Sequence, residues 1–427
     1  MPVPLPRRSS SSIARFPRLS VTLATAVLTV AAAVPAIAQA PEVTPPTGTI
    51  AFIEGRERIH TIEADGSGDT VVFGLQPDAT SGIQAVAWRP DGQRLVFSSG
   101  HEELCSIWVA DLYLMDPDGT DLSRLTNGPA CAAMADLPVG TVRVTVANQT
   151  TDAAEFTIHA QGLEQAVGAA VEPGFQATYE LTLRDLGPDT PQFIVVRNGD
   201  SVWFDAAVYA DVEPGTTVDA GMITAGGDPF DTWGALSASW SRDGTRLAYQ
   251  QGLGSLWQIP ASAGTLDIGS PLFSGDASGT ISATAPVFSP TDDRVLYHRY
   301  DTDPSTIDVG RADADRAGDA VVAATLVNGL DWLPDSSGFV ASDSSTLLDS
   351  ANLVLVDLAS GAVTPLTRFT TGFAMWPTVS PDGAWVAYSY SPVPLDQAEA
   401  MELRLHHIAT GEERLLAVNG LNADWGP

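Results

Sequence analysis

The sequence contains no lysine. Its 21 basic residues are therefore all arginine, and 52 aspartate and glutamate residues outnumber them, which gives a formal net charge of −31. An acidic surface without lysine repels phosphate backbones and anionic lipids, so this composition argues against a nucleic-acid partner and against binding at a membrane surface. The same surface permits Ca²⁺ binding, which is left open as an alternative to having no cofactor.

Cysteine is almost as scarce, since only Cys105 and Cys131 are present. In an exported protein an even pair of cysteines most simply forms one disulfide, and two inert buried thiols are the alternative. The N-terminal region also lacks an apolar run of membrane-spanning length. Residues 21–34 carry no charge, but they fall short of the ~20 apolar residues that a spanning helix needs.

The N-terminus instead has a short apolar run that follows four arginines and ends in the small residues of Ala-Ile-Ala-Gln-Ala. This pattern is typical of a secretory signal peptide over residues 1–40, with an uncleaved anchor as the alternative. Residues 41–48 form a linker rich in proline and threonine. We therefore expect bacterial export, to the periplasm or the medium, with no membrane insertion after cleavage.

One phrase recurs along the rest of the chain. Trp88-Arg89-Pro90-Asp91-Gly92 precedes an alternating apolar stretch, and related phrases are anchored at positions 240, 288, 332, 379 and 425. Proline fixes φ and glycine can take a positive φ, so each phrase predicts a strand ending in a large aromatic residue, a tight turn and a returning strand. The residues given this structural role are Trp88, Asp91, Gly92, Trp240, Asp243, Gly244, Phe288, Trp332, Asp382, Gly383 and Trp425.

From position 240 onward, successive anchors lie 48, 44, 47 and 46 residues apart. A period near 46 suits four short strands, which form one blade of a β-propeller; ordinary hairpins that share a turn are the alternative. The first blade, from residue 49, lacks its innermost strand, and residues 421–425 supply one. We therefore predict an all-β, six-bladed propeller that the C-terminal strand closes, which removes two free sheet edges.

The first interval, from position 88 to position 240, is 152 residues long. The excess over one repeat is too long for a loop. It contains alternating stretches such as residues 141–146 and 178–183, and Asn198-Gly199 predicts a two-residue hairpin turn. We predict an inserted β-sandwich-like domain between blades two and three, near residues 137–225, with an expanded blade as the alternative.

The expected domains are residues 49–128 for blades one and two, 129–232 for the inserted domain with its linkers, and 233–427 for blades three to six with the closing strand. In a blade of four meandering strands, the connection to the next blade lies on the same face as the loop between strands two and three. Cys131 lies in that connection and Cys105 in that loop. A Cys105–Cys131 disulfide would therefore attach the root of the insertion to the propeller.

Blade two carries the fullest copy of the repeat: Trp-Arg-Pro-Asp-Gly at 88–92, Leu-Tyr-Leu-Met-Asp-Pro-Asp-Gly-Thr at 112–120 and Leu-Ser-Arg-Leu-Thr at 122–126. In this order and spacing the blades resemble the TolB-like, or PD40, repeat, a relative of the WD40 repeat. The resemblance covers the six blades and not the insertion, and it implies a propeller scaffold with a binding role. TolB proteins carry an α/β domain before the propeller, and prolyl-oligopeptidase relatives carry a hydrolase domain after it. Neither is expected here, so the resemblance does not imply a Tol–Pal function.

No catalytic motif accompanies the repeats, because the sequence has neither a Gly-x-Ser-x-Gly nucleophile phrase nor a His-Glu-x-x-His metal phrase. The innermost strands contain only two ionisable residues, Asp331 and Asp424, which make a poor metal cage. Aspartates crowd residues 301–319 without the spacing of an EF-hand loop. We therefore predict no catalytic, cofactor-binding or metal-binding residues.

The predicted function is that of a monomeric, non-enzymatic scaffold that binds a protein, peptide or glycan. Its binding surface would be the mouth of the channel and the face that carries the insertion. A propeller hydrolase or lyase with a site at the channel mouth is one alternative, and a structural component of the cell envelope is another.

Overall fold

The computed structural model describes residues 43–76, 82–102, 106, 108, 110–126, 134–160, 166–187, 192–198, 204–226, 234–252, 254–262, 269–272, 283–299, 306–311, 319–323, 327–343, 350–394 and 400–427. The signal-peptide prediction and the Cys105–Cys131 disulfide lie outside these residues. So does most of the acidic stretch 301–319. All of these remain predictions, as do the domain boundaries.

The strands of blades one to three follow the repeat closely, because each turn phrase separates two stretches of alternating apolar residues. Blade one contains β1 (Thr49–Glu54), β2 (Arg58–Glu63), β3 (Thr70–Gly74) and the C-terminal β31 (Gly420–Trp425). Blade two contains β4 (Ile83–Trp88), β5 (Leu95–Ser99), β6 (Asp111–Met115) and β7 (Ser123–Arg124). Blade three contains β15 (Ala235–Trp240), β16 (Arg246–Gln251), β17 (Ser255–Pro260) and β18 (Ser270–Pro271).

The three remaining blades have the same meander. Blade four contains β19 (Ala283–Phe288), β20 (Arg294–Arg299), β21 (Thr306–Arg311) and β22 (Asp319–Ala323). Blade five contains β23 (Val327–Trp332), β24 (Gly338–Asp343), β25 (Ser350–Asp357) and β26 (Val363–Pro365). Blade six contains β27 (Gly372–Val379), β28 (Trp385–Ser391), β29 (Glu402–His407) and β30 (Glu413–Val418). A short parallel pairing of β25 with β27 joins blades five and six.

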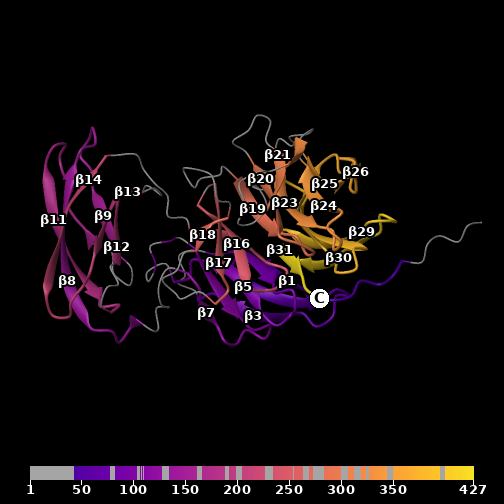
Figure 1. Ribbon diagram of the computed structural model, residues 1–427, viewed down its shortest axis with the longest axis horizontal. Coiled ribbons are helices and arrows are strands. Elements are labelled where there is room, and N and C mark those ends of the chain that lie inside the picture. Colours follow the sequence, from indigo (N-terminus) through magenta and orange to yellow (C-terminus); the bar gives the residue numbers. More distant parts are fainter. Residues whose placement is uncertain are drawn as a thin grey trace, which may run out of the picture. The chain divides into compact units, whose positions relative to one another are not determined.

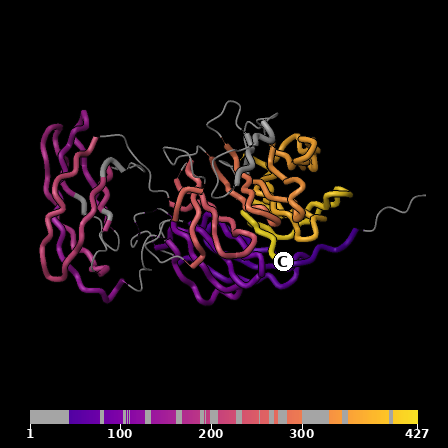
Figure 2. Tube along the Cα trace, in the orientation of Figure 1, coloured from indigo at the N-terminus to yellow at the C-terminus, as the bar shows by residue number. Residues whose placement is uncertain are grey.

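The C-terminal strand closes the ring. β31 pairs antiparallel with β1, with Trp425 opposite Ile50 and Leu421 opposite Ile53. Figures 1 and 2 show this contact as the yellow end of the chain lying beside the indigo first strands. Blade one is therefore built from both ends of the described chain, as the sequence predicts.

The apolar core of the propeller is divided among the contacts between blades. Six clusters of buried residues are found in the described part, and each combines side chains from two neighbouring blades. The cluster between blades two and three, for example, contains Val96 and Leu112 together with Trp240 and Leu247. Each blade is thus stabilised through its neighbours, and this makes closure of the ring important for the whole propeller.

The insertion forms two sheets. One sheet has the order β10 (Ala166–Val167), β9 (Phe156–Ala160), β12 (Gln192–Asn198) and β13 (Phe204–Ala210). The other has the order β11 (Gln176–Arg184), β8 (Val139–Asn148) and β14 (Thr217–Ala225), in which β14 runs parallel to β8. The inward residues of both sheets share one core cluster, which includes Val142, Val144, Phe156, Ile158 and Ile194. Two sheets that face one core form a β-sandwich.

One local prediction in the insertion is wrong. Asn198-Gly199 predicts a two-residue turn, but Arg197 pairs with Phe204, so residues 198–203 all lie between the paired positions. The register of β12 and β13 is set by the apolar residues that face the shared core, and the Asn-Gly signal does not override it. In the described part of the chain, no helix is long and apolar enough to cross a membrane.

Candidate functional site

The repeated phrase forms the same turn around the propeller. In blade two the Asp91 carboxylate accepts a hydrogen bond from the N–H of Gln93 at 3.0 Å, and the N–H of Gly92 donates to the carbonyl of Arg89 at 2.8 Å. Gly92 has a φ of +69°, which glycine adopts without strain. Equivalent aspartate bonds of 2.9 to 3.1 Å occur at Asp243, Asp335 and Asp382. In blade four Asp292 lies one place later in the phrase and accepts from the N–H of Arg294 at 3.0 Å. The aspartates of the phrase therefore build turns.

The aromatic residues of the phrase end the innermost strands and are buried between blades. The exposed fractions are 8% for Trp88, 6% for Trp240, 5% for Phe288, 3% for Trp332 and 7% for Trp425. Val379, exposed by 6%, occupies the same position in blade six. These side chains belong to the clusters that join neighbouring blades, and several of them also line the space beside those clusters.

The residue that precedes each aromatic links one innermost strand to the next. At four of the six joints its side chain accepts a hydrogen bond from the backbone N–H at the equivalent aromatic position of the following blade. The pairs are Asp424 with Trp88 (2.6 Å), Ser239 with Phe288 (3.0 Å), Asp331 with Val379 (2.7 Å) and Thr378 with Trp425 (3.1 Å). We call these four side chains the inter-blade acceptors.

The other two joints have apolar residues at this position, Ala87 and Val287. There the indole of the following blade donates to the backbone instead: Trp240 to the carbonyl of Ala87 at 3.2 Å, and Trp332 to the carbonyl of Val287 at 3.0 Å. Every joint of the ring is therefore closed by a hydrogen bond as well as by packing. A buried bond of this kind contributes about 1 kcal/mol.

A cavity of about 260 Å³ lies at this end of the innermost strands. We call it the motif cavity, because the aromatic and proline residues of the repeated phrases line it, together with Asp331, Thr378 and Asp424. Arg242 is the only cation among the lining residues; it is exposed and donates to the carbonyl of Thr291 at 3.2 Å. Pockets for whole small ligands begin near 300 Å³, so this volume suits a single side chain or a small group.

Two carboxyl groups share the motif cavity. Although the cavity leaves part of each side chain accessible, protein surrounds both groups. This burial, together with the nearby charge of Asp424, raises the pKa of Asp331 to about 7. Burial also raises the pKa of Asp424 to about 6, against the opposing effect of the Trp88 N–H. The Thr378 hydroxyl lies 3.3 Å from Asp331 Oδ2 and also bonds to Asp424. The empty cavity therefore favours the uptake of a proton or of another positive charge.

One further polar atom is unsatisfied at this cavity. The indole Nε1 of Trp88 is buried and has no hydrogen-bond partner among the described residues. Trp88 follows Asp424 around the ring, and this carboxylate binds the Trp88 backbone rather than its indole. Buried donors without a partner are rare and destabilising.

A second cavity, of about 300 Å³, lies toward the beginning of the innermost strands. We call it the bulge cavity, because β-bulges build its wall. In four blades the residue three places before the aromatic position has a positive φ: Ala285 (+53°), Gly329 (+96°), Trp376 (+49°) and Asn422 (+46°). All four line the cavity, and none of the lining residues is charged. Bulges re-aim side chains beside functional sites, but this cavity lacks the charge of the motif cavity.

A buried polar cluster in blade two was not predicted from the sequence. The Arg124 guanidinium is inaccessible and lies 3.6 Å from Glu102, which also accepts a hydrogen bond from the Tyr113 hydroxyl at 3.2 Å. Burial raises the pKa of Asp111 to about 6, and Thr126 donates to its carboxyl group at 2.7 Å. Each charge has a partner of opposite sign or a hydrogen bond, so we assign the cluster to the stability of blade two.

The sequence correctly identifies Asp331 and Asp424 as the ionisable residues of the innermost strands, but it does not reveal that they share one cavity. Nor does it reveal the inter-blade acceptors, although their position immediately before each aromatic residue was a usable signal. Among the described residues, no three histidine, cysteine, aspartate or glutamate side chains come together as metal ligands.

Comparison with known proteins follows from this geometry. No protein-family model matches the chain, and no curated protein sequence matches it. Among solved structures, TolB from Acinetobacter baumannii is similar with a TM-score of 0.51 and 11% identity, over 90% of this chain and 68% of that one. The structure is therefore a TolB-like β-propeller. At this identity the likeness concerns the fold and not the function.

Two further structures are weaker matches. The putative TolB from Agrobacterium tumefaciens gives a TM-score of 0.35 and 17% identity, over 42% of this chain and 60% of that one. A puromycin-hydrolyzing peptidase from Mycobacterium tuberculosis gives a TM-score of 0.41 and 14% identity, over 88% of this chain and 53% of that one. This chain thus spans only part of either protein.

Proposed function

We propose that the chain is an exported, non-enzymatic binding protein, and that its motif cavity receives the basic side chain of a protein or peptide ligand. The observation that carries this proposal is that Asp331 and Asp424 line one cavity of about 260 Å³. An arginine or lysine head group would supply the positive charge that the two carboxyl groups lack. Tryptophan rings from four blades line the same cavity, and cations are stabilised over aromatic faces.

Binding of this kind is coupled to pH. Among the described residues, Arg242, Asp331 and Asp424 are the titratable ones that line the cavity. Without a ligand the two carboxyl groups lose their protons near neutral pH, since their pKa values are raised to about 7 and about 6. A bound cation favours the ionised form and lowers both pKa values. Affinity for a basic ligand is therefore expected to increase as pH rises through this range, with release of protons on binding.

The structural role of the same carboxyl groups supports binding rather than catalysis. Each accepts a short backbone hydrogen bond across a joint of the ring, Asp331 from Val379 and Asp424 from Trp88. A general acid or base must exchange its proton with a substrate, whereas these groups are held by the scaffold itself. A rigid ring that presents fixed carboxylates is suited to recognition of a charged group.

Export is proposed from the N-terminal sequence alone. Arginines, an apolar run and small residues in that order indicate a cleaved signal peptide over residues 1–40. N-terminal sequencing of the protein recovered from the periplasm or the culture medium tests this part. A mature N-terminus near residue 41 is expected, and recovery of the intact N-terminus in the cytoplasm would contradict it.

The binding proposal is tested with an array of synthetic dodecapeptides printed in pairs, in which one member contains arginine or lysine and the other has glutamine in its place. The wild-type chain is compared with the double variant Asp331→Asn/Asp424→Asn, which removes both charges and keeps an acceptor at each joint. Asp335→Asn is the matched control, because Asp335 lies in a turn of blade five, the blade of Asp331, and does not line the cavity. Preference for basic peptides in the wild type and control, lost in the double variant, is expected. Equal capture of both members of each pair would refute the proposal.

A further inference from the structure

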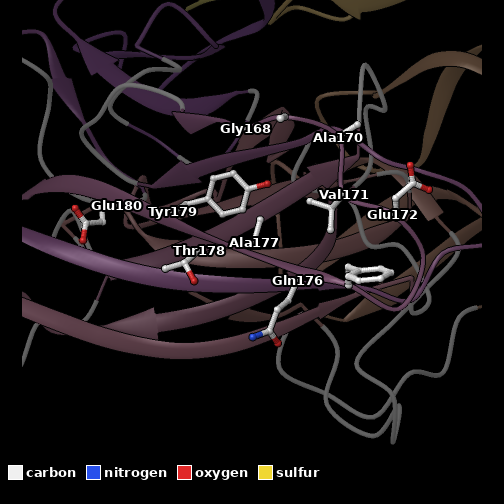
Figure 3. Close-up of a pocket in the computed structure, with 11 residues that line it drawn as sticks. Gly168, Ala170, Val171, Glu172, Gln176, Ala177, Thr178, Tyr179 and Glu180 are labelled. Atoms are coloured by element: carbon white, nitrogen blue, oxygen red, sulfur yellow. The ribbon is translucent and has the colours of Figure 1, made fainter.

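Among the described residues, the insertion has strand edges without a paired strand on one side of its sandwich. On the other side β13 lies against β14, so the edges of the two sheets cover each other. β10 and β11 are the remaining edge strands, and a cavity of about 600 Å³ lies beside them. Its two walls are residues 168–172 and residues 175–180. Figure 3 shows this cavity, which we call the sandwich groove.

The groove follows the backbone edge of β11. Consecutive strand residues point to opposite faces of a sheet, yet all residues from Gln176 to Glu180 line the groove. A cavity in contact with both faces must run along the edge itself. The ladder with β8 shows which residues present their backbone groups there. Asn148 donates to the carbonyl of Phe175, and Asp185 donates to the carbonyl of Pro138.

These two bonds fix the alternation along β11. In an antiparallel pair every second residue bonds to the partner strand and the residues between point outward. Because the odd-numbered positions bond to β8, Gln176, Thr178 and Glu180 direct their N–H and C=O groups toward the groove. An edge that presents unpaired backbone groups is a template for an added strand.

A buried side chain that lines the groove is further evidence for a ligand. Tyr179 is 7% exposed, lines the groove and has a hydroxyl without a hydrogen-bond partner among the described residues. Figure 3 shows its ring extending toward Gly168. A Cβ at Gly168 would lie 2.4 Å from the Tyr179 ring, so glycine is what allows this approach. Apart from Glu172, the opposite wall is small and apolar. On the wall of Tyr179, Phe175 adds an aromatic side chain that is 68% exposed.

The charge of the groove selects the occupant. Its charged lining residues are Glu172 and Glu180, which lie at opposite ends of the groove in Figure 3. Arg143 forms an ion pair with Glu180 at 2.7 Å, whereas Glu172 has no ion pair among the described residues, so Glu172 is the unneutralised charge of the groove. A second copy that paired through the same edge would bring a second unneutralised Glu172 to the groove, which is unfavourable. We propose that the sandwich groove binds an extended segment of a separate protein, with basic and apolar side chains, as an additional strand beside β11. This site is independent of the motif cavity.

The test uses random heptapeptides displayed on phage and selected on the full chain, with Ala170→Trp as the counter-selection protein. Ala170 is exposed in the wall of the groove, so tryptophan there fills the groove without disturbing the core. Enriched peptides are synthesised and their dissociation constants measured by isothermal titration calorimetry. Sequences that combine arginine or lysine with β-branched residues are expected. Failure to enrich any peptide over the Ala170→Trp protein would overturn the proposal.

Two proline variants form a matched pair for the selected peptides. Thr178→Pro removes an outward N–H inside the groove, whereas Thr182→Pro removes the equivalent N–H on the same edge beyond the groove. Thr178→Pro is expected to weaken binding by about tenfold or more, and Thr182→Pro by less than about twofold. Equal effects would overturn the proposal. So would dimers of the wild-type chain that Ala170→Trp converts to monomers, because a second copy would then fill the groove. If Thr178→Pro does not fold, loss of binding in Ala169→Trp serves in its place, because Ala169 is a second exposed residue of the groove wall and that variant takes no part in the selection.

Discussion

Replacing Asp331 by asparagine should change how the stability of the protein depends on pH. Burial and the nearby Asp424 raise the pKa of Asp331 from 3.8 to about 7. Because the folded-state pKa lies above the unfolded one, the folded state binds the proton more tightly. Wild-type stability therefore falls as pH rises from about 4 to about 7, and is constant above that range. The Asp331→Asn variant lacks this dependence.

The size of the effect follows from the same pKa. Each unit of difference between folded and unfolded pKa corresponds to about 1.4 kcal/mol. Between about pH 5 and about pH 8, ionisation of Asp331 is thus expected to destabilise the wild type by about 3 kcal/mol, as an upper bound because the cavity admits some water. The substitution also lowers the free energy of unfolding by an amount that does not depend on pH. The two oxygens of Asp331 accept hydrogen bonds from the N–H groups of Val379 and Trp332, and asparagine has only one side-chain oxygen to replace them. This decrease is about 1 kcal/mol at either pH.

The assay is urea denaturation followed by tryptophan fluorescence at the two pH values. The free energy of unfolding of Asp331→Asn, relative to wild type, should increase by up to about 3 kcal/mol from pH 5 to pH 8. Asp335→Asn is the control: the Ser337 hydroxyl and N–H lower the pKa of the exposed Asp335 carboxyl, so its effect should be equal at both pH values. A constant difference for Asp331→Asn, or one that decreases, would refute the reasoning. Asp424→Asn should act in the same direction with a smaller magnitude.

Three further predictions concern the ring. Trp425→Ala should destabilise the protein by about 3–5 kcal/mol, seen as a lower urea midpoint, because it empties the cluster between blades six and one; an unchanged midpoint would mean that β31 does not close the ring. Gly329→Ala should lower Tm, since φ is +96° and the new Cβ would lie 2.6 Å from the Cα of Trp376; an equal or higher Tm would exclude this backbone conformation. The Ser241 hydroxyl is the main cause that lowers the pKa of Asp243 to about 2. Asp243→Ala should therefore be less stable than the wild type above pH 4, and this difference should disappear as pH falls toward 2. Urea midpoints across that range check this sign, and a growing loss at low pH would contradict it.

The sequence predicts the propeller well because the residues that specify each turn are close together in the chain. A strand, an aromatic residue, proline, aspartate and glycine specify one turn within a few residues, and the spacing of the copies then indicates one blade each. In blade five the phrase has Ser336 in place of glycine, and Ser336 still adopts the positive φ of the turn, at +55°. The closing strand was predictable for the same reason, because its phrase ends the sequence.

Features that depend on distant segments were not predictable. β14 pairs in parallel with β8, with Thr217 opposite Thr141, and no turn signal connects the two strands. The Asn198-Gly199 turn fails for a similar reason, because the core sets the register. The motif cavity likewise needs the ring, since Asp331 and Asp424 come from blades that are not neighbours in the chain. Their shared environment, and not their identity, makes them a candidate site.

Ligand binding in the motif cavity is measured by calorimetric titration of the best arginine-containing peptide from the array against the wild-type chain, at intervals between about pH 5 and about pH 8. Affinity is expected to increase with pH, with proton release, as Asp331 and Asp424 ionise around the bound cation. In Asp331→Asn/Asp424→Asn it should be about tenfold weaker or more at high pH and nearly constant. Binding that is independent of pH, and equal in the two proteins, would contradict the account.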